Sequence, residues 1–239
     1  MFSGGLTGES VMLYAARIAV FLLVIPIHES AHGLMAKKLG DDTAEQKGRI
    51  SLNPMAHLDV TGLVLMLILG FGWAKPVPVN TSNLKHPKSG YAMISAAGPA
   101  SNLLAAFIGA AICTLLFYTD SGQAAAYEMV LNDYSGEYDV IIAAMRLLSS
   151  FVSLNVGLAV FNLIPLPPLD GFNLVRAFLP LRADQWVDAH QRELSSAFIV
   201  LILLGSYVPE VRAPLIYVID KVENLIWLSV EWIEPLMTK

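Results

Sequence analysis

The chain has 239 residues, of which 55% are hydrophobic and 15% are charged, and its mean hydropathy is +0.58. This composition is too apolar for an ordinary soluble domain and predicts several membrane-spanning helices. The formal net charge is −5 and no basic stretch is interleaved with aromatic residues, so nucleic acid is excluded as an expected partner. Cys113 is the single cysteine, which excludes an intrachain disulfide and a thiolate-rich zinc site.

An apolar run from Val11 to Ile27 predicts a first helix that extends to about Met35. We expect this helix to be retained in the protein, because no basic stretch near Met1 marks a cleavable signal. The run closes on the sequence His28-Glu29-Ser30-Ala31-His32, an HExxH motif. In a helix this spacing places two imidazoles one turn apart on one face, where both can ligate one Zn²⁺, with the glutamate angled toward a metal-bound water.

The next stretches alternate between polar and apolar. Residues 37–59 are polar, and the apolar segment Gly62–Trp73 has the length of a re-entrant segment rather than a span. Ala74–Ser89 is rich in proline and predicts either a loop or an irregular edge strand.

Two later runs, Tyr91–Phe117 and Val140–Ile164, each predict a membrane-spanning helix. Ser196–Val208 is a shorter candidate that needs flanking residues to cross. Ala213–Ile233 is apolar but interrupted by charges, so a tilted span and an interfacial amphipathic helix both stay open. The expected fold is therefore an all-α polytopic membrane protein with about four to five transmembrane helices and a short re-entrant or β-like segment.

The distribution of basic residues predicts the orientation of the chain in a membrane. The loop Thr119–Asp139 contains five acidic residues but no lysine or arginine, and we expect it to lie outside. Basic residues follow the first helix, flank the re-entrant segment and follow the span Val140–Ile164: Lys37, Lys38, Lys47, Arg49, Lys75, Lys85, Lys88, Arg176, Arg182 and Arg192. This pattern places the N-terminus outside and the HExxH motif near the cytoplasmic side.

A catalytic zinc site needs a third protein ligand beside the two histidines, with the fourth position left for water. The acidic and histidine candidates are Glu45, His57, Asp59, Glu128 and Asp170. We favour Asp170, because it ends the uncharged run Asn162–Leu169 at the depth predicted for the HExxH motif, where a carboxylate is expensive without a partner. A helix-capping or turn role for Asp170 is the alternative.

Four sequence stretches together resemble the site-2 protease family of intramembrane zinc metalloproteases. They occur in the order His28–His32, Asn53–Asp59, Gly98–Asn102 and Asn162–Gly171. The resemblance covers a catalytic core at about residues 11–180, within a single membrane-embedded domain over 1–239 that also has C-terminal helices at about 195–235. It implies one Zn²⁺ per chain and cleavage of transmembrane protein substrates, in a minimal form that lacks a PDZ or nucleotide-sensing domain.

The resemblance also implies roles for individual residues. Zn²⁺ would be held by His28, His32 and Asp170, and Glu29 would take a proton from water and pass it to the leaving amine. Family resemblance places Asn102 beside the metal, where its amide would contact the substrate. Asn162 is a candidate for supporting the turn before Asp170.

Other readings of these residues remain open at this point. The histidines and Asn102 could make polar contacts between helices, and the Gly98-Pro99 pair could permit a close approach of helices. At the level of the whole protein, the alternatives are a catalytically inactive membrane zinc-binding scaffold and a metal transporter. In the preferred reading the protein lies in the cell (inner) membrane in contact with the lipid bilayer, and a regulatory partner is unidentified.

Overall fold

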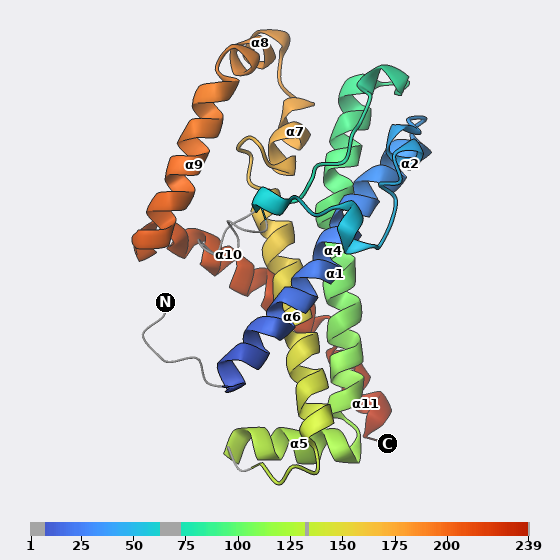
Figure 1. Ribbon diagram of the computed structural model, residues 1–239, viewed down its shortest axis with the longest axis vertical. Coiled ribbons are helices and arrows are strands. Elements are labelled where there is room, and N and C mark those ends of the chain that lie inside the picture. The colour runs from blue at the N-terminus through green and yellow to red at the C-terminus, as the bar shows by residue number, and fades with distance from the viewer. Residues whose placement is uncertain (1–7, 63–72, 132–133, 239) are drawn as a thin grey trace. The chain divides into compact units, whose positions relative to one another are not determined.

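The computed structural model describes residues 8–62, 73–131 and 134–238 (Figure 1). Within these ranges the ordered elements are all helices, which confirms the predicted all-α class. The described helices, in chain order, are α1 (Gly8–Lys38), α2 (Thr43–Gln46), η1 (Pro54–Ala56), η2 (Thr81–Asn83), α4 (Pro87–Phe117), α5 (Asp120–Leu131), α6 (Asp139–Asn162), α7 (Asp170–Arg176), α8 (Leu181–Ala189), α9 (Gln191–Tyr207), α10 (Pro209–Leu228), η3 (Glu231–Ile233) and α11 (Glu234–Met237).

Two of these helices, α4 and α6, are long and apolar enough to cross a membrane, as predicted for Tyr91–Phe117 and Val140–Ile164. Figure 1 shows them as the long green and yellow helices. The bent pair Gln191–Tyr207 and Pro209–Met237 meets the same criterion only when taken together, across a bend of 94°. The described residues thus support two spans, or three if the bent pair is one span, and the total of four to five stays a prediction.

The last third of the chain contributes at most one span, for a physical reason. A span needs about 20 predominantly apolar residues, and α9 has 17. The helix that follows, α10, carries Glu210, Arg212, Asp220, Lys221 and Glu223. Helix α1 is continuous over 31 residues and confirms a helix at Val11–Met35.

The predicted β-like segment is reduced to one isolated bridge in the described part of the chain. Residues 63–72, most of the predicted re-entrant segment, lie outside the described residues. Ala74 forms a single antiparallel bridge with Leu58, and the next backbone N–H, of Lys75, donates to the His57 carbonyl at 2.8 Å. Residues 75–80 then continue as a loop, because Pro76 and Pro78 lack the N–H donors that would extend a ladder.

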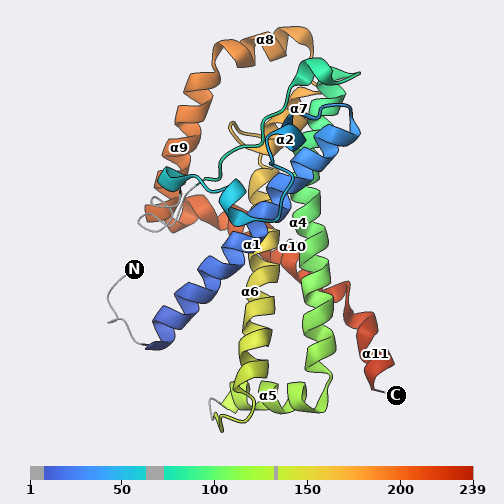
Figure 2. The same ribbon diagram turned by 45° about the vertical axis from the view of Figure 1, so that its right-hand side comes forward.

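The chain divides into two compact units, residues 1–24, 103–156 and 221–239 in the first and residues 25–102 and 157–220 in the second. In the first unit, Cys113 of α4, Ala125 of α5 and Met145 of α6 are buried together in one apolar cluster. Figure 2 shows α5 running across the ends of α4 and α6. These apolar side chains stabilise the packing of the three helices and include no candidate catalytic or metal-binding group.

In the second unit, Asp41 organises the loop that follows α1. Its carboxylate is fully buried and accepts hydrogen bonds from Thr43 N and Oγ1, from Asn80 N and from Asn83 Nδ2, at 2.5–3.2 Å. These bonds join the chain just after α1 to the chain just before α4. Asp41 therefore fixes the connection between the two helices that carry most of the site described below.

We predict that Asp41→Asn destabilises the protein at neutral pH, because an amide N–H₂ would face donors that now bind a carboxylate oxygen. An unmatched buried donor costs about 1–3 kcal/mol, which would lower the midpoint of thermal unfolding in detergent. The exposed neighbour Asp42 supplies the matched control, Asp42→Asn, which should leave the midpoint unchanged.

The same measurement has an expected pH dependence. Burial opposes ionisation of Asp41, but hydrogen bonds from Thr43, Asn80 and Asn83 outweigh it and hold the pKa of the carboxyl below the ordinary value of 3.8. The contribution of Asp41 to stability is thus complete above that value and is lost as the pH falls through the lower pKa of the folded state. A difference between wild type and Asp41→Asn that stays constant into strong acid would contradict this account.

Candidate metal centre

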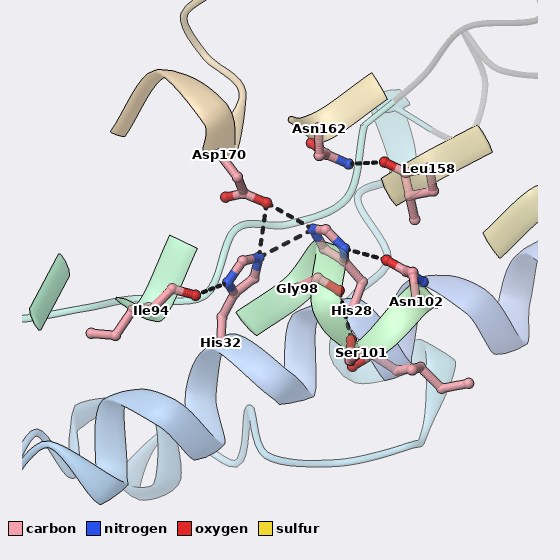
Figure 3. Close-up of polar contacts among 10 residues, drawn as sticks. His28, His32, Ile94, Gly98, Ser101, Asn102, Leu158, Asn162 and Asp170 are labelled. Atoms are coloured by element: carbon pink, nitrogen blue, oxygen red, sulfur yellow. Dashed lines mark hydrogen bonds and ion pairs between the residues drawn. The ribbon is translucent and has the colours of Figure 1, made fainter. Parts of the chain in front are cut away.

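The HExxH motif lies in the C-terminal half of α1 and presents both imidazoles toward one point (Figure 3). His28 and His32 are buried, with 5% and 8% of their surface exposed, and their Nε2 atoms lie 3.1 Å apart. Glu29, on the same turn, is half-buried. The spacing of four residues therefore produces the paired arrangement that the sequence predicted.

Helix α4 orients both imidazole rings through their other nitrogen. His28 Nδ1 lies 2.6 Å from Asn102 Oδ1, and His32 Nδ1 lies 2.7 Å from the Ile94 carbonyl oxygen. Both partners are hydrogen-bond acceptors, so the proton of each neutral ring is on Nδ1. Each Nε2 then keeps a free electron pair directed at the other histidine, which is the tautomer required of a metal ligand.

The contacts from α4 come from one stripe of that helix. Ile94, Gly98 and Asn102 follow one another at intervals of four residues, so they lie on the same face. Gly98 is the point of closest approach: a Cβ atom there would lie 2.6 Å from His28 Cε1 and 2.5 Å from His32 Cε1. The structure thus shows the close approach of helices that the sequence suggested for the Gly98-Pro99 pair.

Asp170 is the first residue of α7 and brings a carboxylate to the two histidines. Its Oδ2 lies 3.1 Å from His28 Nε2 and 3.2 Å from His32 Nε2. Leu169 and Phe172, on either side of it, are buried and anchor the start of the helix. A Cβ at Gly171 would overlap the Leu163 carbonyl oxygen, so glycine lets the chain pass close to the end of α6.

The arrangement of His28 Nε2, His32 Nε2 and Asp170 Oδ2 suits three ligands of one metal ion better than it suits three atoms in direct contact. They form a triangle with sides of 3.1–3.2 Å, and ligands about 2.0–2.1 Å from a tetrahedral Zn²⁺ are about 3.3–3.4 Å apart. Asp170 Oδ2 is buried and makes no hydrogen bond of acceptable geometry, although both Nε2 atoms are near. Three electron-rich atoms this close repel one another unless a positive charge lies among them. Within the described residues, His28, His32 and Asp170 are the group of side chains that could hold a metal ion.

The other predicted candidates for the third ligand have partners elsewhere. Glu45 pairs with Lys37, Asp59 accepts from Gly62 N, and Glu128 accepts from Ser135 Oγ. His57 is fully buried and its Nε2 lies 2.7 Å from the Ser51 carbonyl oxygen.

Asn162 bonds within its own helix. Its Nδ2 donates to the Leu158 carbonyl oxygen at 3.0 Å, one turn earlier in α6, so this bond does not reach the turn before Asp170 (Figure 3). Support of that turn by Asn162 stays a prediction.

In this chain one helix presents HExxH, a separate helix contributes a carboxylate, and other helices are long and apolar. Together these features define a membrane-associated metal-dependent hydrolase of the HExxH class. The chain matches Peptidase family M50 over residues 16–206. It therefore belongs to that family, the site-2 protease family, as the four sequence stretches predicted. Membership identifies the chain as a metalloprotease and zinc as the expected metal.

A protein of Bacillus subtilis (strain 168) described as "Putative zinc metalloprotease YwhC" is similar to this chain. The two are 37% identical over 193 residues, which cover 80% of this chain and 82% of the relative. The compared solved structures contain no match to the chain.

The sequence did not reveal two contacts that shape the site. The first is the Ile94 carbonyl, which has no signature in residue type because every residue carries one. The second is the pair Ser30 and Ser51: Ser30 Oγ donates to the Ser51 carbonyl at 2.7 Å and accepts from Ser51 N at 3.1 Å. The spacing of four residues from Ile94 through Gly98 to Asn102 was the available signal for the first contact.

We predict that Gly98→Ala prevents the protein from retaining zinc. The added methyl group would displace both imidazoles, and their Nε2 atoms would no longer converge with the carboxylate. Metal content after gel filtration, measured by atomic emission, tests this. Gly157→Ala in α6 is the matched control, since its Cβ would meet no atom within 4 Å. Equal zinc content in wild type and both variants would show that the close approach at Gly98 is unimportant.

Proposed function

We propose that this protein is an intramembrane zinc endopeptidase, which hydrolyses peptide bonds within or near the transmembrane helices of membrane-anchored substrates. The proposal rests on one observation above all: two Nε2 atoms and one carboxylate oxygen converge within 3.2 Å in a chain with membrane-length apolar helices. In the proposal His28, His32 and Asp170 hold one Zn²⁺ per chain, and the fourth position is left for water or substrate.

The protein's own residues would divide the chemistry among them. Zinc bound in such a site supplies Lewis-acid polarisation of a carbonyl and increased acidity of water. Glu29, whose side chain is partly accessible, would accept a proton on its carboxylate from the attacking water and deliver it to the nitrogen of the leaving amine. The Ile94 carbonyl and Asn102 Oδ1 would keep the protons of both imidazoles on Nδ1 throughout.

Asn102 would act first on His28. Its side chain is fully buried and its Oδ1 faces His28 Nδ1, which supports a role in fixing the orientation of that ligand. The substrate contact predicted from the sequence remains a second proposal for the same amide. The two roles differ in what they would change, since the first acts on metal affinity and the second on turnover.

We further propose a multi-pass arrangement in the cell membrane, as a single membrane-embedded domain. Basic residues after α1 and after α6 support an active site near the cytoplasmic side, with the N-terminus and the acidic loop 119–139 outside. The substrate would be a transmembrane protein, met laterally from the bilayer, and regulation would come from a separate partner.

We predict that Glu29→Gln abolishes cleavage without loss of zinc. A positioned general base contributes about 10²- to 10⁴-fold in rate, so cleavage of a single-span substrate in detergent should fall by at least the lower figure. Zinc content should stay at one per chain, because Glu29 is not a ligand in the proposal. Glu45→Gln, an identical change at an exposed glutamate, is the control and should cleave normally.

The outcomes separate the proposal from its alternatives. Zinc in both proteins with cleavage by neither, across several substrates, would favour the inactive zinc-binding scaffold. A wild type that holds no zinc would remove the central argument from the two histidines and Asp170.

We predict that Asn102→Ala lowers zinc affinity by about 10- to 100-fold, the usual effect of removing a group that orients a metal ligand. Competition with a chromogenic zinc chelator measures this. Asn224→Ala, the same change at an exposed asparagine of α10, serves as the control, with unchanged affinity. If Asn102→Ala binds zinc normally but turns over substrate slowly, the amide contacts the substrate instead.

A further inference from the structure

Arg49, in the loop after α1, is a buried arginine without an acidic partner. Only 6% of its surface is exposed, its Nη2 donates to the Lys75 carbonyl oxygen, and its buried Nε has no hydrogen-bond partner. In the described ranges, the ion pairs involve other cations: His28, His32, Lys37, Lys88 and Arg176. The sequence of residues 63–72 contains no acidic side chain that could supply the missing charge.

His57 adds a second unmet polar atom in the same loop region. The side chain is fully buried, and its Nδ1 has no hydrogen-bond partner while Nε2 faces the Ser51 carbonyl oxygen. The two residues are joined through the backbone of Lys75, whose N–H donates to the His57 carbonyl and whose own carbonyl accepts from Arg49. We refer to Arg49, His57 and Lys75 as the Arg49 cluster.

Water could satisfy the unpaired polar atoms of the Arg49 cluster, but it could not compensate the cluster's buried positive charge. Water molecules could donate to His57 Nδ1 and accept from Arg49 Nε, which would satisfy these atoms. They would not compensate a buried guanidinium, whose desolvation costs several kcal/mol unless an opposite charge is close. The exposed side chains of Lys47 and Lys75 add positive charge at the edge of the cluster. The cluster therefore lacks an anion.

We propose that the Arg49 cluster binds an oxyanion, the phosphate group of an anionic phospholipid. The planar guanidinium is suited to phosphate oxygens, and basic residues next to a membrane-embedded helix attract anionic headgroups. A phospholipid is the phosphate compound always present beside a chain with membrane-length helices. The bound headgroup would also stabilise the loop that contacts the HExxH turn, because Ser51 bonds both His57 and Ser30.

Lipid binding to the intact protein tests the proposal without any use of proteolysis. Wild type, Arg49→Gln, Lys75→Gln and Arg182→Gln are reconstituted in phosphatidylcholine with or without phosphatidylglycerol, and bound phosphatidylglycerol and the unfolding midpoint are measured. We expect phosphatidylglycerol to bind and stabilise the wild type, and each change in the cluster to weaken binding about fivefold. Arg182→Gln removes the same charge from an exposed position and should behave as wild type.

Three results would overturn the proposal. The first is stabilisation of the wild type that is equal with and without phosphatidylglycerol. The second is an equal loss in Arg182→Gln, which would indicate general surface charge rather than a site. The third is full protection by millimolar inorganic phosphate in phosphatidylcholine alone, which would assign the oxyanion to a free phosphate. If Arg49→Gln does not fold, Lys75→Gln decides the matter, because the Lys75 side chain is exposed and its backbone contacts are retained.

Discussion

The repulsion among three electron-rich atoms is the constraint on which the rest of the site depends. His28 Nε2, His32 Nε2 and Asp170 Oδ2 lie 3.1–3.2 Å apart in buried surroundings. With protons on both Nδ1 atoms, such a triangle is stable only around a positive charge. The fold must therefore hold the ligands in place against their own repulsion whenever the metal is absent. The contacts from α4 and the anchoring of α7 serve that requirement.

Helix α4 meets this requirement mainly through its backbone, with a single side-chain hydrogen bond. Three residues at intervals of four fix the orientation and the distance of the two imidazole rings. They are Ile94 with its backbone carbonyl, Gly98 with no Cβ, and Asn102 with its buried side-chain amide. A rigid helix is suited to this task because its successive turns move together, so the two rings cannot adjust independently. Pro99 has no N–H for the carbonyl one turn earlier, and this removes one backbone bond of α4 beside the imidazoles.

The sequence predicted the parts of this structure that depend on residue type and spacing. HExxH in a helix brings two histidines together through geometry alone, and the uncharged run before Asp170 made that carboxylate conspicuous. The helices α4 and α6 followed from hydropathy. Residues 75–80 form a loop, the first of the two alternatives predicted there, because Pro76 and Pro78 cannot continue a ladder beyond the bridge at Ala74. For the Ile94 carbonyl the sequence offered only the spacing of four residues to Gly98 and Asn102, because which backbone oxygen faces a ring depends on how two helices pack.

The HExxH turn is held from a second side as well, and this links the metal centre to the loop after α1. Ser30 lies two residues after His28, about 200° around the helix axis, so its hydroxyl points away from the metal ligands. Its two bonds to Ser51 attach that face to the loop that contains Arg49 and His57. The ligand-bearing turn thus lies between α4 on one face and a polar loop on another. A change in the loop can reach the histidines only by moving the whole turn, and the contacts at Gly98 leave little room for such a movement. Stability of the loop and geometry of the metal centre are therefore properties of one connected structure, even though Arg49, Ser51 and His57 lie outside the group of side chains that could hold a metal ion.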